Sequence, residues 1–174
     1  SADDFFERKD TCLKVPIRLL FTGRIVFDKG LRELIEAASK LAKAGIRVEV
    51  HFVGWEEVEG SPVQSAMIEL AGQHGISDSI YFHGFKSVGA ELNEMYRMAD
   101  IFVLPSYHEG FPRTIWEAMA NCLPVIATTV GSIPNYLLDG RDALLIPPKD
   151  EEALSIAIQR IIEDDGLRQR LIQA

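Results

Sequence analysis

Short, continuously apolar segments alternate along this chain with longer stretches whose apolar residues recur at helical spacing. Strands that are apolar without alternation are buried on both faces, which is typical of a parallel sheet covered by helices. The sequence therefore predicts an α/β fold, a Rossmann-like doubly wound parallel sheet of about six strands. The expected strands cover residues 17–22, 48–53, 80–82, 101–104, 124–127 and 143–146.

Helical periodicity fills the intervals between these strands. It is strongest from Leu31 to Ala42, and Gly45 ends that helix. Further helices are expected around residues 67–71, 92–99, 112–121, just after Gly131, and 154–162. Ligands of such sheets bind beyond the carboxyl ends of the strands, so the loops that follow the strands are the places to look for a site.

The size and charge of the chain restrict its class. With 174 residues it forms one domain, 1–174, in which residues 1–14 are an irregular N-terminal segment. A formal net charge of -8 argues against broad nucleic-acid binding, which needs a basic face. No apolar run is long enough for a membrane span, and no signal peptide opens the sequence. Cys12 and Cys122 are too few for a disulfide framework, which favours a reducing, cytoplasmic compartment.

The loop after the first strand is a candidate phosphate site. It places Arg24 and Lys29 between a strand end and a helix N-terminus, where backbone amides and the helix dipole also attract anions. The ordinary alternative is a solvated loop in which Arg24 pairs with Asp28. The loop has neither the Walker A pattern nor the G-x-G-x-x-G pattern of dinucleotide binding.

A second candidate is the helix expected at residues 112–121, with the loop before it. Glu109 lies in that loop, and Glu117 lies on the second helical turn and can lean back toward the loop. Arg113 stands where the helix dipole disfavours a cation, and a bound anion would reverse that penalty. The alternative is an Arg113–Glu117 pair at i,i+4. Two carboxylates beside free amides suit a ligand that carries both hydroxyls and phosphate.

The segment from Glu109 to Glu117 resembles the E-x7-E motif of the large retaining glycosyltransferase family with the GT-B fold, called group 1 or family 4. Residues 21–30, F-T-G-R-I-V-F-D-K-G, resemble the family's F-x-G-R-x-x-x-x-K-G. Further matches follow in the expected order over nearly the whole chain, at residues 80–85, 99–112, 116–120, 123–128, 131–135 and 139–150.

The resemblance implies a role for each matching position. Arg24 and Lys29 would bind the donor's diphosphate and neutralise the departing nucleotide, and Glu109 would bind the transferred sugar; these three would be the catalytic groups. Glu117 would bind the ribose hydroxyls. Backbone amides would complete the donor site, and the turn formed by Gly84, Phe85 and Lys86 would lie under the base. Those amides belong to Gly110 and Phe111 near the sugar, and to Arg113 and Thr114 near the phosphates.

The family's fold has two Rossmann-like halves with the active site between them, and this chain matches only the C-terminal, donor-binding half. The resemblance thus implies a hexosyltransferase-like enzyme that uses a UDP-, GDP- or ADP-sugar and lacks its acceptor half here, so that this piece alone is inactive. Peripheral membrane contact of the full-length enzyme stays open. The competing interpretations are a non-catalytic nucleotide-sugar-binding or protein-interaction module of the same ancestry, and another GT-B-like enzyme such as a nucleotide-sugar epimerase.

Some positions depart from the family pattern or carry no clear role. Cys122 stands where many relatives have glycine, which predicts a strained left-handed residue, and Ser132 replaces a second glycine. His83 and His108 are expected to be packing or loop histidines. The sequence has no D-x-D, and its histidines lack ligand spacing, so we expect no metal cofactor and assign its role to Arg24 and Lys29.

Overall fold

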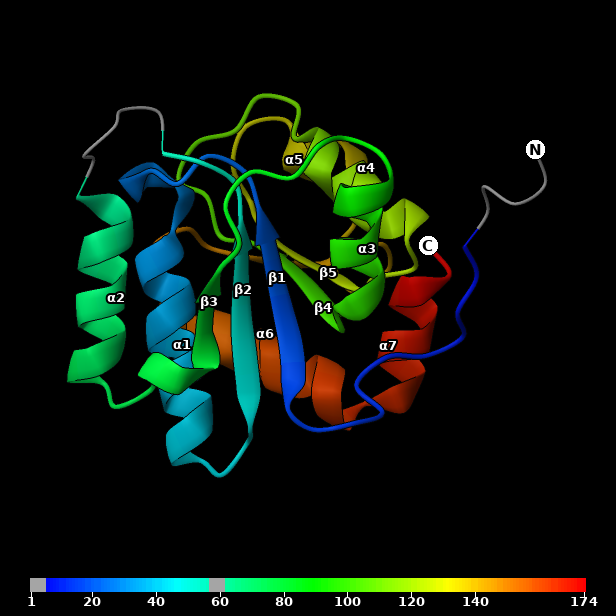
Figure 1. Cartoon of the computed structure of the whole chain (residues 1–174). Coiled ribbons are helices and arrows are strands. Elements are labelled where there is room, and N and C mark those ends of the chain that lie inside the picture. The colour runs from blue at the N-terminus through cyan, green and yellow to red at the C-terminus, as the bar shows by residue number, and fades with distance from the viewer. Residues whose placement is uncertain (1–5, 57–61) are drawn as a thin grey trace.

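The computed structural model describes residues 6–56 and 62–174, and its centre is one parallel sheet (Figure 1). The strands lie in the order β3-β2-β1-β4-β5-β6, and all neighbours run parallel. This doubly wound order confirms the predicted fold class. The strands are β1 (Ile17–Thr22), β2 (Val48–Val53), β3 (Ile80–Phe82), β4 (Ile101–Leu104), β5 (Val125–Thr128) and β6 (Leu144–Ile146).

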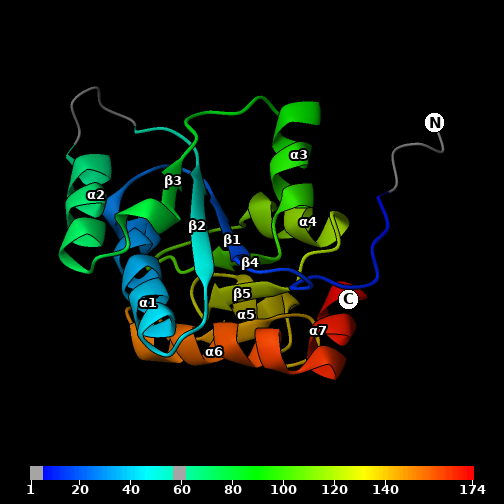
Figure 2. The same ribbon diagram turned by 60° about the horizontal axis from the view of Figure 1, so that its bottom comes forward.

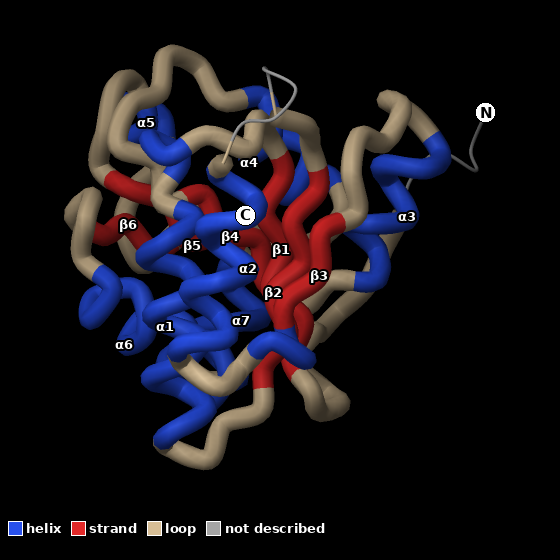
Figure 3. The backbone as a smooth tube through the Cα atoms, turned by 60° about the vertical axis from the view of Figure 1, so that its left-hand side comes forward, coloured by secondary structure: helices blue, strands red, loops and turns tan. Residues whose placement is uncertain are grey.

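The helices cover both faces of the sheet. The α-helices are α1 (Leu31–Lys43), α2 (Val63–Gln73), α3 (Ala90–Met98), α4 (Arg113–Ala120), α5 (Ile133–Tyr136), α6 (Glu151–Glu163) and α7 (Asp165–Ile172), and two 3-10 turns are η2 (Phe27–Lys29) and η3 (Ser77–Ser79). In Figures 1 and 2, α1, α2 and α6 lie side by side against one face, and α3 and α4 lie on the other. Figure 3 shows the strands in red with the blue helices around them.

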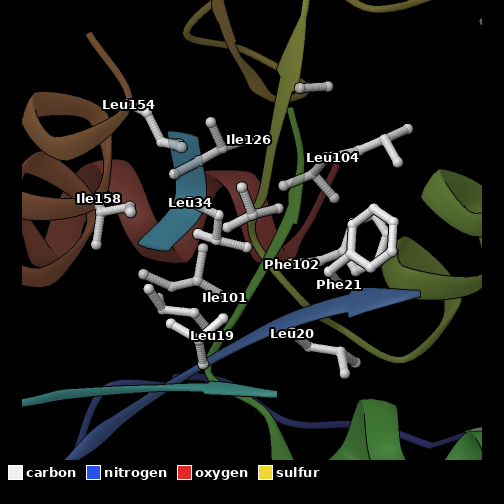
Figure 4. Close-up of a cluster of buried hydrophobic side chains, with 14 of the residues drawn as sticks. Leu19, Leu20, Phe21, Leu34, Ile101, Phe102, Leu104, Ile126, Leu154 and Ile158 are labelled. Atoms are coloured by element: carbon white, nitrogen blue, oxygen red, sulfur yellow. The ribbon is translucent and has the colours of Figure 1, made fainter. Parts of the chain in front are cut away.

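The core forms where the apolar strands meet these two helical layers. Leu19 and Ile101 are register partners on β1 and β4, and they point toward Leu34 of α1 and Ile158 of α6 (Figure 4). On the other face, Phe102 packs its ring against that of the fully buried Tyr96 of α3, at 5.9 Å between centroids. Both faces of the central strands are therefore buried along most of their length, as their mainly apolar sequence predicts.

The structure places several boundaries differently from the sequence expectation. β5 and β6 each begin one residue later than expected, and α4 begins at Arg113 with Pro112 as its N-cap in extended conformation. The helix α7 was not anticipated, because its apolar residues are few and no glycine or proline separates it from α6. Its start depends instead on Asp164, whose side chain accepts a hydrogen bond from the Leu167 amide.

The N-terminal segment packs onto the domain through two arginine contacts. Arg8 donates to backbone carbonyls at the C-terminal ends of both α3 and α4, including those of Ala99 and Cys122. Asp10 forms an ion pair with Arg168 of α7, in which the Nε–Oδ1 distance is 2.6 Å. Residues 1–5 of this segment lie outside the described residues. Within the described part of the chain, no helix is long and apolar enough to cross a membrane.

Candidate functional site

A pocket of about 330 Å³ opens at the carboxyl ends of β1, β2 and β4, which form the upper edge of the sheet in Figure 1. The side chains of Arg24, Lys29, Glu109 and Glu117 all line it. These are the cations and carboxylates that the sequence singles out, and they come from two loops and one helix. The structure thus brings together residues that lie up to 93 positions apart in the chain.

Lys29 and Glu109 form an ion pair in the pocket wall. The Nζ–Oε1 distance is 2.5 Å, and the side chains are only 14% and 10% exposed. The Ser106 hydroxyl donates to the same carboxylate oxygen at 2.7 Å, and the Ser106 carbonyl accepts from the Thr128 hydroxyl. The Glu109 carboxylate is therefore held in place from two sides.

The loops that carry these two side chains are packed directly on each other. Gly30 adopts φ 73°, and a Cβ there would lie 2.0 Å from the Pro105 carbonyl oxygen. Gly131, at φ 57°, approaches from β5, and its Cβ would lie 1.7 Å from the Glu109 carbonyl oxygen. Only glycine permits both approaches. Gly30 allows the Lys29 loop to pack on the loop that leads to Glu109, and Gly131 allows the β5 loop to pack on Glu109 itself.

Tyr107 adds a second link between the same loops. Its amide donates to the Asp28 carbonyl at 2.8 Å, and its hydroxyl donates to the buried Glu33 carboxylate of α1 at 2.5 Å. Burial raises the pKa of the Tyr107 hydroxyl, which keeps it a donor at neutral pH. The side chain that precedes His108 and Glu109 is therefore directed away from the pocket and anchors the loop.

Glu117 is held by a short chain of hydrogen bonds. The Tyr96 hydroxyl donates to its Oε2 at 2.9 Å and contacts the Thr22 hydroxyl at 2.8 Å. Tyr96 is fully buried, and burial raises the pKa of its phenol, so it stays protonated and donates. The sequence pattern showed Tyr96 only as an apolar helical position. The one signal of its role that the sequence offered was its position on the inward face of the helix that became α3.

The N-terminus of α4 faces the pocket without a capping side chain. Pro112 is the N-cap, and among the described residues no side chain accepts from the first-turn amides of Arg113 and Thr114, both of which line the pocket. Helix N-termini leave such amides for water or a ligand. No ion pair joins Arg113 to Glu117, although both residues are described, so the alternative i,i+4 pair is absent.

The remaining candidates divide between the pocket and its surroundings. Lys86 lines the pocket, whereas Gly110 and Phe111 do not. The Gly110 carbonyl accepts from the Ser132 hydroxyl, and the Phe111 ring stacks on Trp116. Cys122 has φ 55°, which confirms the left-handed conformation predicted for it.

The two histidines noted in the sequence lie outside the pocket wall. His108 is exposed, and the His83 ring stacks on His51 with a 2.8 Å contact between ring nitrogens. Desolvation lowers the pKa of His51 and of His83. Among the described residues, no group of three or more acidic, histidine or cysteine side chains is arranged to hold a metal ion.

Basic side chains, carboxylates and a helix N-terminus thus gather at the carboxyl edge of a Rossmann-like sheet, which is where ligands of such folds bind. Residues 4–174 match the family described as glycosyl transferases group 1, and the chain belongs to that family. Among its relatives is a glycosyltransferase of Methanocaldococcus jannaschii, 27% identical over 154 residues, a match that covers 88% of this chain and 38% of the relative.

Two solved structures have the same fold as this chain. The C-terminal domain of a group 1 family protein, LpcC, from Francisella tularensis superposes with a TM-score of 0.83 and 28% identity, over 99% of this chain and 92% of that one. Anabaena Alr3699/HepE in complex with UDP-glucose superposes with a TM-score of 0.82 and 22% identity, over 90% and 42%. The chain spans about two fifths of the length of its first curated relatives.

Proposed function

We propose that this chain is the donor-binding half of a retaining, family 4 glycosyltransferase, and that it binds a nucleotide-diphosphate sugar. The observation that carries the proposal is the convergence of Arg24, Lys29, Glu109, Glu117 and the N-terminus of α4 on one pocket. Two cations and free amides suit a diphosphate, and two separate carboxylates suit the hydroxyls of two sugars.

Each part of the donor has a place in this proposal. The diphosphate lies between Arg24, Lys29 and the first-turn amides of α4, and the transferred sugar lies against Glu109. Glu117, which Tyr96 holds in place, binds the ribose. The amides of Gly110 and Phe111 stay assigned to the sugar end, although neither residue lines the pocket.

The chemistry requires a stable leaving group. When the bond between the anomeric carbon and the diphosphate oxygen breaks, positive charge develops on the sugar and negative charge on the phosphates. Lys29, which is held by its ion pair with Glu109, and Arg24 both line the pocket where that negative charge would develop. Positive groups placed there before the reaction begins lower the barrier most effectively. Retention, with the acceptor on the face that the diphosphate leaves, follows from the family resemblance.

The other half of the active site belongs, in this proposal, to an N-terminal acceptor domain of the longer protein, which acts in the cytoplasm and makes at most peripheral membrane contact. The domain assignment is residues 1–174, with 1–14 as the segment that leads in. We expect the chain alone to bind donor without transferring sugar. Transfer rates for the chain alone that equal those of the longer protein would contradict this division of labour.

A non-catalytic module of the same ancestry is the main competing interpretation. A module that had lost donor binding would have no need for an ion pair between Lys29 and Glu109 inside an open pocket, where desolvation makes it costly. Donor binding that depends on these side chains therefore argues against a protein-interaction module, and sugar transfer by the longer protein separates the enzyme half from a module that only binds a nucleotide-sugar.

Thermal stabilisation by UDP-, GDP- and ADP-sugars identifies the donor, because a ligand that binds only the folded state raises its stability. Calorimetry then compares the wild-type chain with Arg24→Ala and Glu117→Ala. We expect roughly tenfold or greater losses of affinity in both, since each removes a charged hydrogen-bonding group. Arg47→Ala, an exposed position before β2, is the control and should bind like the wild type. Wild-type affinity in the first two variants would refute the site.

A further inference from the structure

Two exposed aromatic rings form a corner at the end of the pocket farthest from Glu109. Trp55, just after β2, is 47% exposed, and Phe85, just after β3, is 61% exposed. Their ring centroids are 5.5 Å apart and the planes meet at 79°. Rings at right angles leave the free part of each face open, so a planar group that stacks on one ring touches the other with its edge.

Backbone hydrogen bonds fix the two segments that carry these rings. The Gly54 amide donates to the Gly84 carbonyl at 2.9 Å, which ties the turn before Trp55 to the turn before Phe85. The Ile25 amide donates to the Trp55 carbonyl at 2.8 Å, which ties the same segment to the loop that carries Arg24. The corner is therefore fixed relative to the proposed phosphate site.

The strand order gives the pocket a direction. Lys29 and Glu109 lie at the ends of β1 and β4, whereas the aromatic corner lies at the ends of β2 and β3, on the opposite side of β1. Val88 and Leu92 also line the pocket with apolar side chains. A ligand with its sugar at Glu109 and its diphosphate at the β1 loop thus extends its remaining part toward Trp55.

We propose that Trp55, together with Phe85, stacks on the nucleobase of the bound donor and makes a large contribution to nucleotide affinity. Phe85 belongs to the turn that the family resemblance places under the base, whereas Trp55 lies in none of the sequence motifs. The proposal rests on the proposed donor site. Stacking of a base on an aromatic side chain is worth about 1–3 kcal/mol, which corresponds to roughly a 5- to 150-fold change in affinity. An apolar corner without a bound base would leave both rings in water.

The chain offers a reporter and a matched control, because its only other tryptophan is Trp116. Trp116 is 38% exposed, stacks on Phe111 and lies outside the pocket wall. In the Trp116→Phe variant all tryptophan fluorescence comes from Trp55. We expect UDP to change that emission and inorganic pyrophosphate, which has no base, to leave it unchanged. Equal responses to the two probes would overturn the proposal.

Affinities measured by calorimetry test the same point without relying on fluorescence. Trp55→Ala should weaken UDP binding roughly tenfold while pyrophosphate binding stays within about twofold, and Trp116→Phe should match the wild type for both. If UDP binds the wild type and Trp55→Ala equally well, the stacking proposal fails and the donor site stands. If UDP does not bind the wild type, the proposed function fails, and the stacking proposal with it.

Discussion

At the scale of single residues, the site depends on polar groups that hold one another in place before a ligand arrives. Lys29 and Glu109 form a largely buried ion pair in the pocket wall, and the Ser106 hydroxyl donates a further hydrogen bond to Glu109. Glu117 depends in the same way on Tyr96. Such prearranged contacts reduce the cost of ordering side chains when a ligand binds.

The Lys29–Glu109 pair should show strong energetic coupling. Lys29→Met leaves a carboxylate without its cation, and Glu109→Gln leaves an ammonium without its anion, so each single variant loses stability. The double variant should lose less than the sum, with a coupling of about 1–3 kcal/mol. Urea unfolding of the wild type, the two single variants and the double variant measures this coupling energy. Strictly additive losses of stability would show that the pair contributes nothing.

Tyr96→Phe tests the contact that positions Glu117. Removal of one hydroxyl that donates to a carboxylate should weaken UDP binding by about 1–2 kcal/mol, and the loss should fall on UDP and not on pyrophosphate. Calorimetry with both ligands measures this difference. Tyr136→Phe, at an exposed tyrosine of α5, is the matched control. Unchanged UDP affinity in Tyr96→Phe would separate Tyr96 from the ribose site.

At the scale of elements, the fold was readable from sequence where the pattern was strong. The central strands were predicted to the residue because they are mainly apolar, with Arg18 in β1 and Glu49 and His51 in β2 as the charged or titratable exceptions. The helix α1 was located by its periodicity and by Gly45. The pattern was weak at α7, whose beginning depends on one capping aspartate. The site was predicted as a set of residues, but the supporting contacts were not, because the hydroxyls of Tyr96 and Ser106 reach their carboxylates only through tertiary packing.

The close approach of the β5 loop to the Glu109 loop gives a test at this scale. Gly131→Ala places a Cβ against the Glu109 carbonyl, so the loop must move and UDP-glucose affinity should fall. Gly140→Ala is the control, because Gly140 has a similar φ of 73° with nothing within 4 Å of its Cβ. Both should lose about 1 kcal/mol of stability from backbone strain, and only Gly131→Ala should lose further stability and affinity. Calorimetric affinities that fall equally in both variants would count against the packing argument.

At the scale of the whole molecule, stability should depend on pH in two separate windows. Burial lowers the pKa of His51 and His83, so the unfolded chain takes up protons first, and stability falls as pH drops below about 6.5. The hydrogen bond from Arg168 lowers the pKa of Asp10, so its contribution is lost only below about pH 4.

Urea unfolding as a function of pH separates these windows. His83→Gln keeps a donor for His51 and removes one titrating group, so it should reduce the loss between pH 7 and 5.5 and leave the lower window unchanged. Asp10→Asn should reduce the loss of stability below about pH 4 and leave the loss between pH 7 and 5.5 unchanged. A wild-type stability that is constant from pH 7 to 5.5 would contradict the burial argument for the histidines.

A crystal structure of the chain with bound UDP tests the central claim most directly. The account predicts that the diphosphate lies between Arg24, Lys29 and the N-terminus of α4, with the ribose at Glu117 and the uracil toward Trp55. UDP bound at another surface, or in this pocket with its phosphates directed away from Arg24 and Lys29, would contradict it.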